Sequence, residues 1–342
     1  MRGLRQKTYK AAWQRLITSN LLPFTTERLQ SGKSNFSCAP PVERGSMPIP
    51  TTDPLVTIPM ASPFQPTGEL DLDAAQHNVT RWLQTPIAGY LVGSQSGEEF
   101  SMSEQERVTL LKTVTETLEG DTFSIGGIDC PSVAETLRQA ENYANAGAEM
   151  VRIRFPRHEE NVLDYFQHVL PRSPVPVLLM HQTSPASFGI AAQPAAEPEV
   201  LGEVASMDNV FGYVTDHDMR FEARVRRYVP KEKRFWICNG SMILSGTLIG
   251  CNGTTTAFSN IWPSALKELL DLGMAGQFNE GQVLQEQVRL IDEIMLPYLA
   301  AGIKACLKLM GFQGMNIRQP ARTIPPGKLQ QLETVMREAG LI

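Results

Sequence analysis

The sequence has no apolar run long enough to cross a membrane and no excess of basic charge. A membrane-spanning helix needs about 20 consecutive apolar residues, and no stretch of this chain reaches that length. Acidic residues outnumber basic residues by 36 to 31, which gives a net charge of −5. Because a nucleic-acid-binding surface needs a basic excess, we expect a protein that binds neither nucleic acid nor a membrane.

Cysteine is scarce, and its spacing excludes the usual zinc and disulfide patterns. The five cysteines are scattered along the chain and include no CxxC pair. An odd, unpatterned set is typical of reduced thiols in a reducing compartment. We therefore expect a cytoplasmic protein without a structural metal or a disulfide framework.

The first 46 residues differ in composition from the rest of the chain. They contain eight Lys or Arg residues and only two acidic residues. Basic, acid-poor segments are typical of organelle transit peptides, and the alternative is a disordered leader ahead of a start at Met47. We expect one folded domain over 47–342, and an organellar location if residues 1–46 act as a transit peptide.

From Met47 onward, short β-branched and aromatic runs alternate with helical patterns. Eight runs predict strands, at 55–60, 89–93, 123–127, 149–154, 176–181, 209–214, 235–239 and 253–257. Four further patterns predict helices after the last strand, at 264–273, 279–296, 299–311 and 327–339. Eight strand–helix units favour an α/β fold, a (β/α)8 TIM barrel, with a C-terminal helical extension from about 279. A doubly wound sheet is the alternative, but no G-x-G-x-x-G follows the first expected strand.

Several segments, in order along the chain, carry a resemblance to a known family. They are Gly89-Tyr-Leu-Val-Gly-Ser-Gln-Ser-Gly97-Glu98, Asn209-Val-Phe-Gly-Tyr-Val214, Phe235-Trp-Ile-Cys-Asn-Gly240 and Gly253-Thr-Thr-Thr-Ala257. They are similar to strands two, six, seven and eight of the dihydrodipicolinate synthase and N-acetylneuraminate lyase family. The resemblance covers roughly 55–342. It implies a lyase or aldolase barrel acting on a small 2-oxo acid or sugar acid, assembled as a homodimer or homotetramer.

The residues that carry the family's chemistry are replaced in this chain. In the family, a lysine closing strand six forms an imine with a 2-oxo acid, and a tyrosine ending strand five relays protons. The resemblance places Val214 at the lysine and Met180 at the tyrosine, and Gln95-Ser96 replaces a Thr-Thr pair that holds the substrate carboxylate. Valine cannot form an imine, and residues 205–230 contain no lysine. We therefore expect a divergent member that lacks the Schiff-base lysine.

Active sites of such barrels lie at the carboxyl ends of the strands, so polar residues at those ends are the site candidates. The candidates for catalysis are His181, His217 and Arg154, because imidazole acts as a general base near neutral pH and guanidinium pairs with carboxylates. The candidates for substrate binding are Gln95, Ser96, Arg154, Gly240 and Thr255. The alternative for Arg154 is a structural ion pair with Glu98 or Asp129.

Two functions from different classes fit these residues. The first is an enzyme that acts on a small carboxylate without an imine and without a cofactor. A variant of this hypothesis uses a divalent metal, for which the candidate ligands are Asp129, His181, Asp216 and His217. The second is a non-catalytic barrel that binds a small carboxylate or serves as a regulatory or structural subunit.

Overall fold

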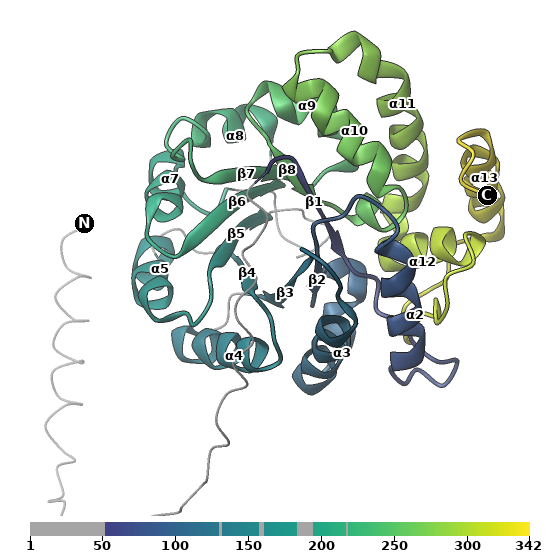
Figure 1. Cartoon of the computed structure of the whole chain (residues 1–342), viewed down its shortest axis with the longest axis horizontal. Coiled ribbons are helices and arrows are strands. Elements are labelled where there is room, and N and C mark those ends of the chain that lie inside the picture. The colour runs from purple at the N-terminus through teal and green to yellow at the C-terminus, as the bar shows by residue number, and fades with distance from the viewer. Residues whose placement is uncertain (1–51, 130–131, 157–160, 183–193, 217) are drawn as a thin grey trace, which may run out of the picture. The chain divides into compact units, whose positions relative to one another are not determined.

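The computed structural model describes residues 52–129, 132–156, 161–182, 194–216 and 218–342. These residues form a closed barrel in which eight parallel strands lie in chain order (Figure 1). The strands are β1 Leu55–Pro59, β2 Gly89–Val92, β3 Phe123–Ile128, β4 Met150–Arg154, β5 Val177–Gln182, β6 Val210–Asp216, β7 Arg234–Ile237 and β8 Gly253–Thr255. All eight expected strands are confirmed, and their ends agree with the sequence patterns to within two residues. The expected leader, 1–46, lies outside the described residues.

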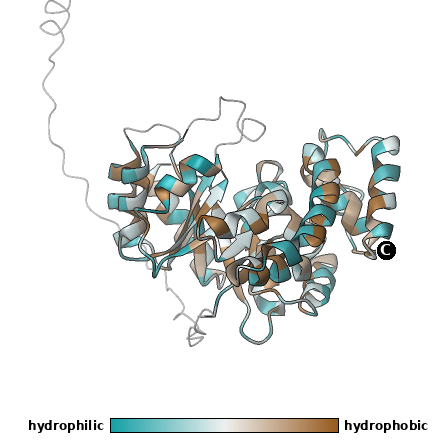
Figure 2. Ribbon diagram, turned by 90° about the horizontal axis from the view of Figure 1, so that it is seen from above, coloured by the Kyte–Doolittle hydropathy of each residue, from teal (hydrophilic) through white to brown (hydrophobic). Residues whose placement is uncertain are grey.

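Helices surround the strands and cover the outer face of the barrel (Figure 1). They are α2 Leu72–Trp82, α3 Glu104–Thr117, α4 Val133–Asn145, α5 Val162–Val169, α7 Pro198–Ser206, α8 Met219–Val225, α9 Ile243–Leu248 and α10 Pro263–Met274. Helix α3 begins with a capping box, because Ser103 accepts from the backbone of Glu106 and Glu106 accepts from the backbone of Ser103. Each helix carries both apolar and polar residues (Figure 2), as amphipathic helices that pack on a sheet do.

Side chains alternate between two cores along each strand. One core lies between the strands and the helices, and the other fills the inside of the barrel. The inner core consists of Leu55, Leu91, Phe123, Ile125, Met150, Leu178, Met180, Val214 and Trp236. The period of two along a strand therefore determines which side chains reach the carboxyl end of the barrel from within.

The chain continues beyond the barrel in α11 Phe278–Met295, a short 3-10 turn η7 Leu296–Tyr298, α12 Ala300–Leu309 and α13 Pro326–Glu338. The four helices expected after the last strand are confirmed. The turn from α11 into α12 is tight, because a Cβ at Gly302 would lie 2.2 Å from the backbone oxygen of Met295. Leu299 takes a φ of 47° there, which is rare for a residue with a side chain. This turn brings the ends of α11 and α12 over the carboxyl ends of the strands.

Candidate functional site

A cavity of about 550 Å³ lies at the carboxyl ends of the strands. Its walls come from β1, β2, β4, β5 and β6, from the turns that follow β2, β7 and β8, and from α11, η7 and α12. Such a volume suits a small-molecule ligand, and barrel enzymes place their sites at this end. The C-terminal extension therefore forms part of the cavity wall.

The inner side chains of β5 and β6 form two layers at the cavity. Met180 pairs in register with Val214, and one layer nearer the carboxyl ends Gln182 pairs with Asp216. Val214 is fully buried in the inner core, and Met180, Gln182 and Asp216 line the cavity. The wall that stands where the resemblance expects lysine and tyrosine is thus apolar, with an amide and a carboxyl directly above it.

No lysine lines this cavity among the described residues. The internal segments outside the described residues contain no lysine in their sequence. Lys304 follows Ile303, a wall residue, but its ammonium group is buried against Glu98 and the backbone oxygen of Asn316. Burial lowers the pKa of Lys304 to about 8.

Two buried arginines project inward from β4 and share one carboxylate. Arg154 donates to Glu99 at 2.5 Å, and Arg152 donates to the other oxygen of Glu99 at 3.3 Å. Arg154 also pairs with Asp129 at 3.4 Å and donates through Nε to Gln182. Burial and the neighbouring guanidinium lower the pKa of Arg152 to about 10. Arg154 thus forms the structural ion pair with Asp129 that was the alternative to substrate binding. It does not pair with Glu98, which pairs with Lys304, and Glu99 is its other acidic partner.

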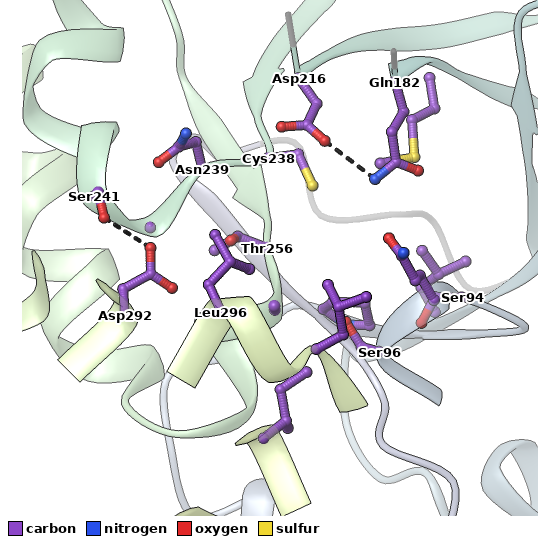
Figure 3. A pocket seen from close by; sticks show the side chains of 18 of the residues that line it. Ser94, Ser96, Gln182, Asp216, Cys238, Asn239, Ser241, Thr256, Asp292 and Leu296 are labelled. Carbon is purple, nitrogen blue, oxygen red and sulfur yellow. Dashed lines mark hydrogen bonds between the residues drawn. The ribbon is translucent and has the colours of Figure 1, made fainter. Parts of the chain in front are cut away.

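Asp216 is the titratable group on the cavity wall that this network holds. Gln182 accepts from Arg154 and donates through Nε2 to Oδ2 of Asp216 at 3.1 Å (Figure 3). Burial raises the pKa of Asp216 to about 7, although the hydrogen bond from Gln182 acts in the opposite direction. A carboxyl group with this pKa takes up and releases a proton readily near neutral pH.

A second carboxyl group enters the cavity from α11. Asp292 is 2% exposed, and its Oδ2 accepts from the hydroxyl of Ser241 at 2.8 Å (Figure 3). Burial raises the pKa of Asp292 to about 6. Cys238 also lines the cavity, but burial raises the pKa of its thiol well above the ordinary value, so it is not a ready nucleophile.

Most of the candidates for substrate binding meet in this cavity. Gln95, Ser96, Arg154 and Gly240 line it. Thr255 does not, because it lies buried in β8, whereas the next residue, Thr256, forms part of the wall.

His181 does not face the cavity, contrary to the expectation from strand ends. Met180 and Gln182 point inward, so the period of two turns His181 outward toward α8. Its ring is fully buried, with Nδ1 2.6 Å from Glu222 and Nε2 accepting from the backbone of Ala195. The second histidine candidate, His217, lies outside the described residues.

The described residues contain no group of three or more His, Cys, Asp or Glu side chains that could hold a metal ion. Of the candidate ligands for a metal, Asp129 is engaged with Arg154, His181 faces Glu222 and Asp216 bonds Gln182. The structure therefore does not bring these three together as a coordination site.

No described helix is long and apolar enough to span a membrane.

Comparison with known proteins identifies the family of this barrel. The model of the Dihydrodipicolinate synthetase family matches residues 55–339, which is most of the chain. The chain belongs to this family. Among curated members, the 4-hydroxy-tetrahydrodipicolinate synthase of Exiguobacterium sp. is 24% identical over 264 residues, which cover 75% of this chain and 88% of that protein.

A second curated protein and a solved structure are similar to this chain over most of its length. A protein of Halobacterium salinarum described as an uncharacterized DapA-like lyase is 24% identical over 301 residues, covering 85% of this chain and 96% of its own. The solved structure of a monomeric dihydrodipicolinate synthase variant superposes with a TM-score of 0.78 at 21% identity, covering 86% of this chain and 99% of its own. The protein is thus a lyase-like member of the dihydrodipicolinate synthetase family.

Strand ends and the resemblance did not predict the roles of three residues of the site, which are Glu99, Asp216 and Asp292. Glu99 lies one residue beyond the Gly97-Glu98 pair of the resemblance and gave no signal of its own. Asp216 carried a usable signal, because it shares the inward parity of Val214.

Proposed function

We propose that this protein is a lyase that acts on a small carboxylate substrate without forming an imine, and that Asp216 moves the proton. The observation that carries the proposal is the pairing of an apolar Met180–Val214 layer with a titratable Asp216 directly above it. A carboxyl group whose pKa is about 7 is matched to proton transfer at neutral pH. No lysine of the described residues lies on the cavity wall.

The reaction needs only this one proton-transfer group. For a 4-hydroxy-2-oxo acid, the carboxylate of Asp216 takes the hydroxyl proton while the adjacent C–C bond breaks. The electron pair of that bond moves toward the 2-oxo group and forms an enolate, and the former hydroxyl carbon leaves as a carbonyl. Protonated Asp216 then returns its proton to the enolate carbon, which gives a 2-oxo acid and an aldehyde.

The residues around Asp216 supply the remaining interactions. Ser94 and Ser96 line the cavity after β2, and the hydroxyl of Ser94 is buried without a partner among the described residues. These hydroxyls are donors for the substrate carboxylate and for the developing oxyanion. Gln182 fixes the orientation of Asp216, and Arg154 fixes Gln182 in turn.

The test is turnover of a panel of 2-oxo and 4-hydroxy-2-oxo acids by the full-length protein, with and without a chelator. Asp216→Asn keeps the shape of the side chain and removes its proton transfer, so we expect kcat to fall by about 100-fold or more. In the wild-type enzyme, the rate should rise with pH through about 7, because the ionised form of Asp216 accepts the proton.

Asp218→Asn is the matched control. Asp218 caps α8 by accepting from the backbone of Arg220 and Phe221, and asparagine is an equally good cap. We expect this variant to keep the wild-type rate. If Asp216→Asn also keeps the wild-type rate, the proposed role of Asp216 is refuted. If the wild-type protein binds members of the panel but turns none over, the protein is the non-catalytic carboxylate-binding barrel instead.

A further inference from the structure

The cavity contains a second group of polar residues, separate from the hydrogen-bond network of Asp216. Asp292 comes from α11, and Asn239 and Ser241 follow β7 (Figure 3). Ser241 satisfies only one oxygen of Asp292. Oδ1 of Asp292 and Oδ1 of Asn239 are buried and have no hydrogen-bond partner among the described residues. Two acceptor oxygens on one part of the wall therefore lack a donor.

A buried carboxylate oxygen without a donor is costly. No described Lys or Arg forms an ion pair with Asp292. The arginine nearest to it in sequence, Arg289, is already paired with Glu286 and Glu293 on the exposed side of α11. Leaving a buried charged acceptor unpaired costs more than leaving a neutral one. No described residue therefore supplies the donor that this oxygen of Asp292 needs.

The charge of the cavity indicates which kind of donor is needed. Arg152 and Arg154 are matched by Glu99 and Asp129. The other charged residues of the wall are all acidic, namely Asp216, Asp292 and Glu293, and Asp292 is the most deeply buried of them. A hydroxyl group supplies a hydrogen bond but no positive charge, whereas a protonated amine supplies both.

We propose that Asp292 and Asn239 bind a protonated amino group, so that the substrate is a small carboxylate that also carries a cation. This inference rests on the proposed function in one respect, namely that the cavity is the substrate site. It adds a specificity-determining residue that lies outside the barrel strands. Although burial raises the pKa of Asp292 to about 6, the side chain is still mostly ionised near neutral pH and able to pair with an ammonium group.

The experiment measures binding rather than turnover, so that it stands apart from the test of Asp216. The probes are 2-oxo acids of matched chain length that end in an ammonium, a hydroxyl or a methyl group, titrated calorimetrically into the full-length protein. Asp292→Asn removes the charge but keeps an oxygen that accepts from Ser241. Glu286→Gln is the control, because it removes one charge from the same helix at an exposed position outside the cavity.

We expect the wild-type protein to bind the ammonium probe at least about tenfold more tightly than the hydroxyl probe, because charge-assisted hydrogen bonds are stronger than neutral ones. In Asp292→Asn that ratio should fall to near one while the affinity for the methyl probe stays unchanged, and Glu286→Gln should keep the wild-type ratio. An equal or reversed preference in the wild-type protein overturns the inference without any variant. A preference that survives Asp292→Asn also overturns it. If no probe binds, the proposed function fails together with the inference, whereas binding without preference refutes the inference alone.

Discussion

The shared carboxylate of Glu99 gives the sharpest prediction for stability. Glu99 is 2% exposed and lies between Arg152 and Arg154, which are themselves buried. The change Glu99→Gln removes the negative charge and leaves two guanidinium groups close together in a site that water hardly reaches. The carboxylate of Glu99 acts to raise the pKa of Arg152, so its loss disfavours the charged form of this buried guanidinium further.

The expected cost follows from these contacts. Removing one partner of a buried ion pair typically destabilises a protein by about 3–5 kcal/mol. Arg154 keeps Gln182 and Asp129, and Arg152 keeps the backbone oxygens of Gly93 and Ile128. We therefore expect Glu99→Gln to lower the free energy of unfolding by about 3 kcal/mol, toward the low end of that range.

Urea-induced unfolding of the full-length protein, followed by circular dichroism, measures this cost. A second change, Arg152→Met, removes the like charge from the Glu99→Gln background and should recover about 1–2 kcal/mol, as contacting residues couple in double-mutant cycles. The control is Glu333→Gln, which breaks the exposed pair with Arg337 on α13 and should change little. A loss below about 1 kcal/mol for Glu99→Gln, or no recovery in the double variant, would refute this account of the arginine pair.

Three further predictions concern other buried charges. Because burial raises the pKa of Asp292 to about 6, Asp292→Asn should stabilise the protein above that pH by up to about 3 kcal/mol. The gain should shrink as the pH falls through about 6 and vanish only well below about 4, where the aspartate is neutral in both the folded and the unfolded state. Thermal unfolding across this pH range measures the gain, and a gain that grows toward acid contradicts the prediction. Lys304→Met leaves the buried carboxylate of Glu98 without its ammonium partner and should cost about 3 kcal/mol in urea unfolding, whereas an unchanged midpoint would show that the pair contributes nothing. Glu222→Leu removes the carboxylate that contacts His181 and should lower the free energy of unfolding by about 2 kcal/mol or more. Ligand affinity measured by calorimetry should not change. Weaker ligand binding would show instead that His181 contributes to the cavity.

The barrel could be predicted from the sequence because its signals are local. Each strand is a short apolar run bounded by helical patterns, and its inner and outer residues follow from the period of two. The same period contains the correction for His181. Once Met180 is placed inside the barrel, Gln182 must also point inward and His181 outward. The expectation for His181 came from its position near a strand end and did not use this parity.

The rest of the site depends on features that have no period. Glu99 reaches the arginines because two 3-10 turns, η1 Gln95–Gly97 and η2 Glu99–Ser101, flank Glu98 in the left-handed region with a φ of 58°. Asp292 reaches the cavity because α11 packs beside the barrel and then turns sharply at η7. Tertiary packing decides both positions, and no local pattern in the sequence encodes a contact between residues so far apart.

Borohydride trapping tests most directly whether the protein works without an imine. Wild-type protein and a Val214→Lys variant are incubated with pyruvate and borohydride, and intact mass and peptide mapping then locate any reduced adduct. We expect no adduct on the wild-type protein. In the variant we expect one adduct at position 214, because that side chain belongs to the inner core directly beneath Asp216. An adduct on a lysine of the wild-type protein would contradict the account and restore the imine mechanism.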